Sequence, residues 1–500
     1  MATYNIGSRR EVCWDEYLMD SCEGIRVQMH QPEFKEVIME MDKGWEGQNC
    51  GYFTIIREGE VYRFYYRAAN MEKVDEDGCN DYAHKSYYCV METRDGRNFT
   101  RVPVNEIPFM GVKENNIIIE PTPENEMDNV FFFYDRNPEC PADERYKALS
   151  GANGQKLAYY KSGDGIHFER ARVLVDDGAY DSLNVCFWDS DTKQYYLYYR
   201  GMHGPSIVSG KWDFGDVSEE RRAEIWKHGI GCIRDVRVRT SKDFVTWEPM
   251  QKLDYGPDAP DIELYTNNTM KYYRANHMFL AFPTRYVDRY EDAKQFHHLT
   301  DWKHRQQVMD KIEPRSGTAL TDTAIMTSRD GVNFRRTEEA WWTAGYERGI
   351  NWYYGDGYFN YGMIETKNEL PGGPNEISMY CQTLGACELR RYTIRLDGFF
   401  SWRCDAKPGK VVTKPITFEG ASMEVNFATS IYGYVRIKLM DADGNYIEGY
   451  DSGRMFGNRV DRIVEFDADL AALSGKDVRM EISMFDADLY SFRVNKVPRF

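Results

Sequence analysis

Short apolar runs rich in Tyr, Phe and Val alternate with short polar turns through the first four hundred residues. In the first unit these runs are 51–56, 61–67 and 86–92, and their length and aromatic content are typical of strands. Similar runs predict strands at 129–134, 145–149, 156–161, 183–188, 194–200, 233–239, 264–272, 277–282, 322–327, 358–364, 376–381 and 389–394. The pattern therefore predicts an all-β fold.

A turn motif recurs between these strands. Its fullest copy is Ser328-x-Asp330-Gly-x-x-Phe334, and related copies centre on Asp95, Asp164, Asp243 and, in degenerate form, Asp397. An Asp carboxylate accepts bonds from turn amides, Gly adopts positive φ without strain, and the aromatic packs back on the sheet. One Asp-Gly hairpin is common in any β protein. Five copies spaced by 67 to 87 residues indicate a structural repeat.

Each repeat holds about four antiparallel strands, which is what one blade of a propeller needs. Five repeats predict a five-bladed β-propeller over residues 43–404. Residues 1–42 are expected to pack on the propeller as an N-terminal segment. Strands at 11–19 and 25–29 lie within it, and one of them is expected to complete the last repeat or cover an edge.

Two insertions interrupt the repeats, and their roles stay open. Residues 217–228 predict a helix with Ser218 as its cap, and 291–312 are polar and helical in pattern. A linker-like stretch follows near 405–410. The shorter alternating strands after it predict a small β-sandwich over 408–500, with strands at 422–428, 434–439, 462–466, 478–484 and 490–494.

The composition narrows the classes of partner. Aromatic residues make up 15% of the chain, which suits both sheet surfaces and sugar-stacking clefts. The formal charge of −17 argues against nucleic acid and against an anionic membrane surface, although solubility alone could explain it.

The start of the chain has no apolar core typical of a signal peptide, and no run of about 18 apolar residues predicts a membrane span. The 11 cysteines are scattered without a CxxC motif, so we expect reduced thiols and a cytoplasmic protein.

Acidic residues precede several of the predicted first strands. In a propeller these strands line the central channel, so acids from distant repeats would converge at one mouth. Glu46, Asp181 and Glu263 are the candidate catalytic residues on this basis. Converging carboxylates shift each other's pKa values, and this can supply the acid and the base or nucleophile of glycoside cleavage. The alternative is that each acid is a turn residue.

Arginines end the second strands of repeats one, three and four at Arg67, Arg200 and Arg285. Such arginines can hold a sugar hydroxyl, orient a carboxylate or bind an acidic substrate through paired bonds. The alternative is a salt bridge within the blade.

Aromatic and acidic side chains near the predicted mouth complete the candidate substrate-binding set. Trp45, Trp352 and Tyr265 could stack on a sugar ring, although core packing is the alternative for each, and Asp356 precedes the fifth first strand.

No GxGxxG, GxxxxGK[ST], HExxH or GxSxG element occurs in a fitting context, so no cofactor is expected. His297, His298 and His304 cluster in the second insertion without the spacing of a metal site, and no metal is expected.

Together, the five repeats, the acids before the first strands and the C-terminal sandwich resemble the five-bladed propeller glycoside hydrolases. This is the group of invertases and fructanases, arabinanases and β-xylosidases. By position, the resemblance implies that Glu46 is the base or nucleophile, that Asp181 tunes the pKa and orients the substrate, and that Glu263 is the general acid. The chain departs from the group at Glu46, where the group usually has Asp, and in Arg234-Asp235-Val236, where fructanases have Arg-Asp-Pro. The identity of the substrate sugar therefore cannot be inferred from the resemblance to this group.

The predicted function is hydrolysis of a glycosidic bond in an oligosaccharide. A carbohydrate-binding propeller without activity, a glycoside phosphorylase and an acidic-sugar hydrolase similar to sialidases remain alternatives. The expected partner is a carbohydrate substrate, and a homo-oligomer stays open.

Overall fold

The computed structural model describes residues 3–497 except for 48, 75–79, 83, 85, 126, 153–155, 205, 206, 209, 210, 213–232, 301, 304, 307–316, 349, 350 and 384–386. Strands dominate it, and its helical structure includes the short 3-10 helices η1 (Ala142–Glu144), η2 (Tyr290–His298) and η3 (Leu470–Leu473). No helix in the described part is long and apolar enough to cross a bilayer.

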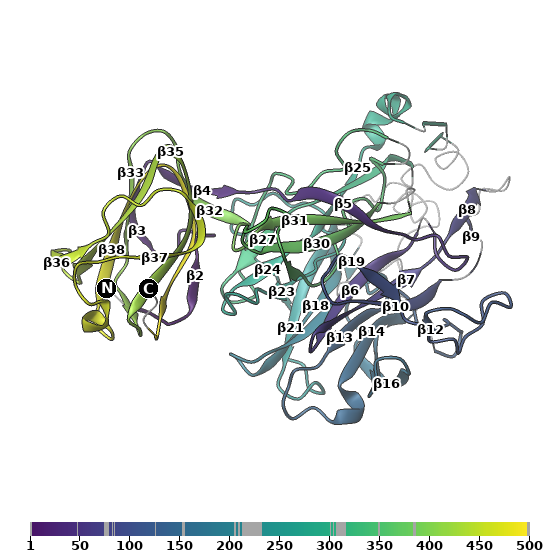
Figure 1. Cartoon of the computed structure of the whole chain (residues 1–500). Helices are drawn as coiled ribbons and strands as arrows, with labels where there is room; N and C mark the ends of the chain where they lie inside the picture. The colour runs from purple at the N-terminus through teal and green to yellow at the C-terminus, as the bar shows by residue number, and fades with distance from the viewer. Residues whose placement is uncertain are drawn as a thin grey trace.

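Five antiparallel sheets, counted over the described residues, form the blades of a β-propeller (Figure 1). Blade one contains β6 (Gly51–Glu58), β7 (Val61–Ala68), β10 (Tyr87–Thr93) and β11 (Phe99–Arg101), and β12 (Ile117–Ile119) also pairs with β10. Blade two contains β13 (Phe131–Tyr134), β14 (Tyr146–Ala152), β15 (Lys156–Ser162) and β16 (Glu169–Val175), and blade three contains β17 (Val185–Asp189), β18 (Gln194–His203), β21 (Ile233–Ser241) and β22 (Gln251–Lys252). Blade four contains β23 (Met270–Lys271), β24 (Phe279–Ala281), β27 (Met326–Ser328) and β28 (Phe334–Arg336), and blade five contains β29 (Ile364–Thr366), β30 (Glu376–Thr383), β31 (Glu388–Arg395) and β5 (Glu33–Glu40). A parallel bridge between Thr54 and Tyr361 joins blades one and five. The prediction of an all-β, five-bladed propeller is confirmed.

The last blade is completed by a strand from the start of the chain. β5 pairs antiparallel with β31, and the purple β5 runs beside the green β31 in Figure 1. The sequence placed this role on 11–19 or 25–29, which the structure corrects. β5 is an outer strand with mostly exposed or half-buried side chains, so it lacks the apolar pattern that marks inner strands.

The remaining N-terminal strands lie in the C-terminal sheet system rather than on the propeller, which differs from the expectation for residues 1–42. They are β1 (Tyr4–Gly7), β2 (Arg10–Val12), β3 (Met19–Glu23) and β4 (Ile25–Met29), and they pair with β34, β38, β33 and β32 respectively. Both ends of the chain therefore build this second region.

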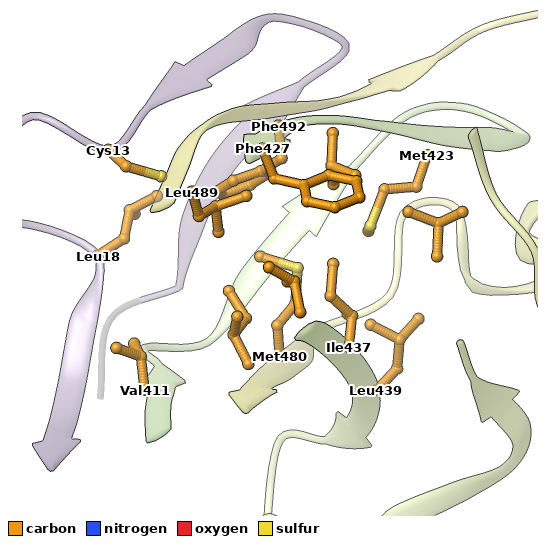
Figure 2. Close-up of a cluster of buried hydrophobic side chains, with 14 of the residues drawn as sticks. Cys13, Leu18, Val411, Met423, Phe427, Ile437, Leu439, Met480, Leu489 and Phe492 are labelled. Atoms are coloured by element: carbon orange, nitrogen blue, oxygen red, sulfur yellow. The ribbon is translucent and has the colours of Figure 1, made fainter. Parts of the chain in front are cut away.

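The C-terminal region contains β32 (Phe400–Cys404), β33 (Gly409–Thr413), β34 (Ile416–Phe418), β35 (Ser422–Asp441), β36 (Tyr446–Asp451), β37 (Asn458–Val464) and β38 (Val478–Asn495). The predicted strands 422–428 and 434–439 form one long strand, β35, which pairs along most of its length with β38. The register shifts between Thr429 and Tyr434, where Gly433 lets β35 approach β38 closely. A core of Val, Leu, Ile, Met and Phe side chains fills the space between the strands (Figure 2).

Among the described residues, three two-stranded antiparallel pairs lie outside the blades. They are β8–β9 (Met71–Val74, Asn80–Tyr82), β19–β20 (Ile207–Val208, Lys211–Trp212) and β25–β26 (Thr284–Asp288, Ala319–Thr323). The predicted helix 217–228 falls outside the described residues. In the second insertion, η2 ends at His298, and much of the remainder is also outside the described part.

The recurring turn is built as its residues predict in four blades. Asp95, Asp164, Asp243 and Asp330 each accept two backbone amide bonds of 2.7 to 2.9 Å from the residues two and three positions later. Asp397 differs because it is buried where the propeller meets β38. Its carboxylate accepts from Tyr272, Arg274 and Ser491 instead.

A buried carboxylate also joins the two regions. Glu11 on β2 is fully buried, and its Oε2 lies 3.3 Å from His277 Nε2 of blade four and 3.3 Å from Arg329 Nη1. Burial alone would raise the pKa of Glu11. The close contact with His277 and the charges of His277, Arg329 and Arg9 outweigh burial and lower that pKa to about 2.

Candidate functional site

Tyrosine rings from three blades gather where the inner strands begin. Tyr52 of β6 stacks on Tyr358, which precedes β29, with ring centroids 6.2 Å apart. Tyr358 in turn stacks on Tyr265, which precedes β23, at 5.7 Å and an interplanar angle of 14°. Tyr354 meets Tyr265 edge-on at 5.5 Å. Blades one, four and five thus contribute to one tyrosine cluster at the mouth of the propeller, made of Tyr52, Tyr265, Tyr354 and Tyr358.

The guanidinium groups of three arginines lie over the rings of this tyrosine cluster. The Arg200 guanidinium of β18 lies 5.3 Å from the Tyr265 ring centroid, and that of Arg234 on β21 lies 5.7 Å from the same ring. Arg67 of β7 lies 4.8 Å from the ring of Tyr52. Each distance is within the range of a cation–π interaction. Two guanidinium groups of blade three therefore share one tyrosine of blade four.

Two of the three predicted catalytic acids meet these arginines. Asp181 forms an ion pair with Arg200, and Glu263 forms one with Arg234. The Asp181 side chain is 59% exposed and that of Glu263 is 20% exposed, so both carboxylates reach solvent. Because both arginine partners contact the Tyr265 ring, the structure brings these acids to one site.

The charges around Tyr265 change its acidity. Burial raises the pKa of the phenol, but the guanidinium charges of Arg200 and Arg234 and the hydrogen bonds of Tyr354 and Tyr52 lower that pKa below its ordinary value. The pKa of Arg200 is also lowered, first by burial and then by the neighbouring charge of Arg234.

Glu46 lies in a different environment. Its side chain is buried, and Arg101 of the outer strand β11 donates to both carboxylate oxygens at 2.8 and 2.6 Å. Tyr66 adds a hydroxyl bond of 2.6 Å. The neighbouring Trp45 donates to Asn116 within the same buried cluster. These contacts do not join Glu46 or Trp45 to the Tyr265 site.

Of the remaining predicted residues, Arg285 lies on β25, and Trp352 and Asp356 lie in the segment before β29. Arg285 of β25 pairs with Asp322 of β26 at 2.6 Å, so it is held within its own hairpin. Trp352 donates to the Gly345 carbonyl oxygen at 2.8 Å. Asp356 is buried in the segment that also carries Tyr354. Burial raises the pKa of its carboxyl to about 6, against backbone bonds that lower it.

A cleft of about 280 Å³ adjoins Arg234. Arg234 lines it together with His203 and Asp235. His203 is held between Asp235 Oδ2 at 2.9 Å and Asp261 Oδ2 at 2.8 Å. Over the described residues, no group of three or more His, Cys, Asp and Glu side chains could hold a metal ion.

Sequence reasoning missed Arg234 and the tyrosines Tyr52, Tyr286, Tyr354 and Tyr358. Arg234 lies 4.4 Å from the ring centroid of Tyr286, which is a further contact between blades three and four. Arg234 pairs with Met202 in the β18–β21 ladder, and Arg200 pairs with Val236. Arg200 and Arg234 therefore lie on the same face of the sheet, but this register is set by the fold and could not be identified from the sequence. The tyrosines could not be identified either, because the chain has 36 Tyr and no motif separates these four from the rest.

The fold and site define a five-bladed β-propeller with a C-terminal β-sheet region and a polar aromatic mouth. No family model matches the chain, and no curated protein matches it.

Solved structures share its overall course. A glycoside hydrolase family 43 arabinoxylan arabinofuranohydrolase from Bacillus subtilis is similar over 92% of this chain and 98% of that chain, with 11% identity and a TM-score of 0.40. For a putative glycosidase from Bacteroides thetaiotaomicron, the shares are 72% and 96%, at 12% identity and a TM-score of 0.39. For an exo-β-1,3-galactanase from Phanerochaete chrysosporium, the similarity covers 94% of this chain and 100% of that chain, at 8% identity and a TM-score of 0.35. At these identities and TM-scores, the functional argument depends on the site itself.

Proposed function

We propose that the chain is a glycoside hydrolase that cleaves a glycosidic bond at the mouth of the propeller. The observation that carries this proposal is that two carboxylate–arginine pairs, Asp181–Arg200 and Glu263–Arg234, meet on the ring of Tyr265. Paired carboxylates are the chemical requirement for this reaction. Tyr354 and Tyr358, which are half-buried rather than buried, supply flat apolar surfaces of the kind on which a sugar ring packs.

The two acids take complementary roles. Glu263, with the more buried side chain, is the general acid that gives its proton to the leaving oxygen as the bond to the anomeric carbon breaks. Asp181, which is more exposed, activates water as a base or attacks the anomeric carbon as a nucleophile. In either case one water is consumed, and the carboxyl groups end in their starting states. Glu46 is left out of this pair because Arg101 and Tyr66 already engage both of its oxygens.

The test uses isosteric variants on an aryl glycoside that the wild-type protein cleaves. Glu263→Gln and Asp181→Asn should each lower kcat by about a hundredfold or more. Each variant also removes the charged partner of a buried arginine, so activity is compared at a temperature below the onset of unfolding of every variant. The matched control is Glu92→Gln, which changes a half-exposed carboxylate paired with Arg63 in blade one. Full activity in both site variants would exclude the assignment. Failure of the wild-type protein to cleave any member of a broad panel, despite binding sugars, would favour a carbohydrate-binding protein. Activity that requires phosphate would indicate phosphorolysis.

A further inference from the structure

The mouth of the propeller concentrates buried positive charge, although the chain as a whole has a formal charge of −17. The Arg200 side chain is only 3% exposed, and that of Arg234 is only 9% exposed. Both guanidinium groups contact the same tyrosine, so they are also close to each other. Burying two like charges together is unfavourable unless anions compensate them. The arrangement therefore requires negative charge at this position.

The positive charge of Arg200 is only partly compensated by its neighbours on the buried side of the guanidinium group. Its Nε donates to the Ala179 carbonyl oxygen at 2.9 Å, which is a neutral acceptor. Its carboxylate partner, Asp181, is 59% exposed. Because Asp181 is exposed, it can turn toward water, but the buried charge of Arg200 is then uncompensated unless another anion replaces it. Another carboxylate can then take its place on Arg200.

We propose that Arg200 and Arg234 bind the carboxylate of an acidic sugar residue, and that Asp181 leaves Arg200 when this substrate enters. The inference rests on the proposed function, because it assigns the substrate class of the same site. A guanidinium group offers paired, coplanar N–H donors that match a carboxylate. The half-buried rings of Tyr354 and Tyr358, which contact Tyr265 beside both arginines, provide the surface for the sugar ring that carries this carboxylate.

The exchange of partners has a chemical consequence. When the substrate carboxylate occupies the arginines, Asp181 and Glu263 lose part of their compensating positive charge. This exchange frees the Asp181 carboxylate from Arg200 for its role as base or nucleophile. A neutral sugar would leave both ion pairs in place.

The first measurement is calorimetric binding of D-glucuronate and D-galacturonate, with D-glucose, D-galactose and inorganic phosphate as comparison ligands. The wild-type protein should bind at least one uronate about tenfold or more tightly than its neutral parent. Arg200→Gln should abolish this preference. Arg63→Gln is the matched control, because Arg63 lies on β7 at an ion pair with Glu92, and it should keep the preference.

A second variant keeps the inference testable if Arg200→Gln does not fold. Asp181→Asn removes the resident competitor for Arg200, so it should bind the uronate more tightly than the wild-type protein, by a few-fold. Weaker binding would contradict the exchange.

The other outcomes separate the inference from the proposed function. Equal binding of uronates and neutral sugars, or no uronate binding, overturns the inference, as does phosphate binding without uronate binding. Cleavage of neutral aryl glycosides alone would also overturn it while leaving the hydrolase assignment intact. Tight, Arg200-dependent uronate binding without cleavage of any aryl uronide would support the inference and count against hydrolysis.

Discussion

The Tyr380 hydroxyl of blade five donates a 2.6 Å hydrogen bond to the carbonyl oxygen of Gly96, in the recurring turn of blade one. The same relationship joins blades three and four, where Tyr198 donates to Gly331 at 2.8 Å. The turn glycine of one blade thus packs under a tyrosine of the blade before it. The recurring turn is therefore an inter-blade contact as well as a reversal of the chain.

A side chain at Gly96 should disrupt this contact. The residue has a φ of +72°, and a Cβ there would lie 2.6 Å from the Tyr380 hydroxyl and 2.8 Å from Thr366 Cγ2. Gly96→Ala should lower the free energy of unfolding by about 2–4 kcal/mol, from backbone strain and overpacking together. Gly59→Ala is the control, because Gly59 has a φ of +59° but open space around it, and it should cost only about 1 kcal/mol. Urea titration measures both, and equal losses would refute the contact.

Glu46→Gln should act on stability rather than on chemistry. Removing the charge breaks the buried ion pair with Arg101, and this should cost about 3 kcal/mol in urea unfolding. Glu92→Gln breaks the more exposed pair with Arg63 and should cost less than about 1 kcal/mol. If Glu46→Gln instead removed activity at unchanged stability, the catalytic role expected from the sequence would be restored.

The junction between the propeller and the C-terminal region should weaken in acid. The pKa of Glu11 is about 2 in the folded chain, below its ordinary value of 4.5. A lowered carboxyl pKa stabilises the fold at pH values above 4.5, and this stability is lost as the pH falls toward 2. The loss should reach about 3 kcal/mol. Unfolding free energies at pH 7, 4.5 and 3 should fall for the wild-type chain and stay flatter for Glu11→Gln. A parallel fall in the two chains would contradict the assignment.

Asp356 should have the opposite pH dependence. Its pKa of about 6 exceeds the ordinary 3.8, so the folded state prefers the protonated carboxyl and loses stability as the pH rises from about 4 to above 6. Asp356→Asn keeps an oxygen for the Tyr353 amide, 3.1 Å from Oδ2 in the wild-type chain. It should raise the unfolding free energy at pH 8 by about 2–3 kcal/mol and leave it unchanged near pH 4. A lower stability of Asp356→Asn at pH 8 would contradict the raised pKa, because it would show that the charged carboxylate stabilises the fold.

The architecture could be predicted from the sequence because the blade is a local unit. Asp330, Gly331 and Phe334 are close in the chain, and their spacing encodes a turn that is built within the same few residues. The strand completing blade five could not be predicted in the same way. β5 pairs with β31 some 350 residues later, and an outer strand carries little apolar pattern.

The sequence indicates only part of the candidate site. Asp181 and Glu263 could be proposed from it because acids before inner strands can approach the axis of a propeller, and both stay predictions whose side chains pair with arginines over Tyr265. Their partner Arg234 was missed because its contact depends on which side of β21 faces blade four, and the sequence alone does not fix that side. Glu46 has the same position before a strand, but Arg101 on the outer strand binds its carboxylate.

The pairing of β5 with β31 also bears on how the chain is made. While the ribosome is still translating blades one to four, the segment at residues 33–40 has no partner, and β1 to β4 wait for strands beyond residue 399. Such distant pairings form slowly, because the long intervening loop must close first. The nascent protein therefore carries an unpaired N-terminal arm until its final fifth emerges, and this arm is the part for which a chaperone would matter most.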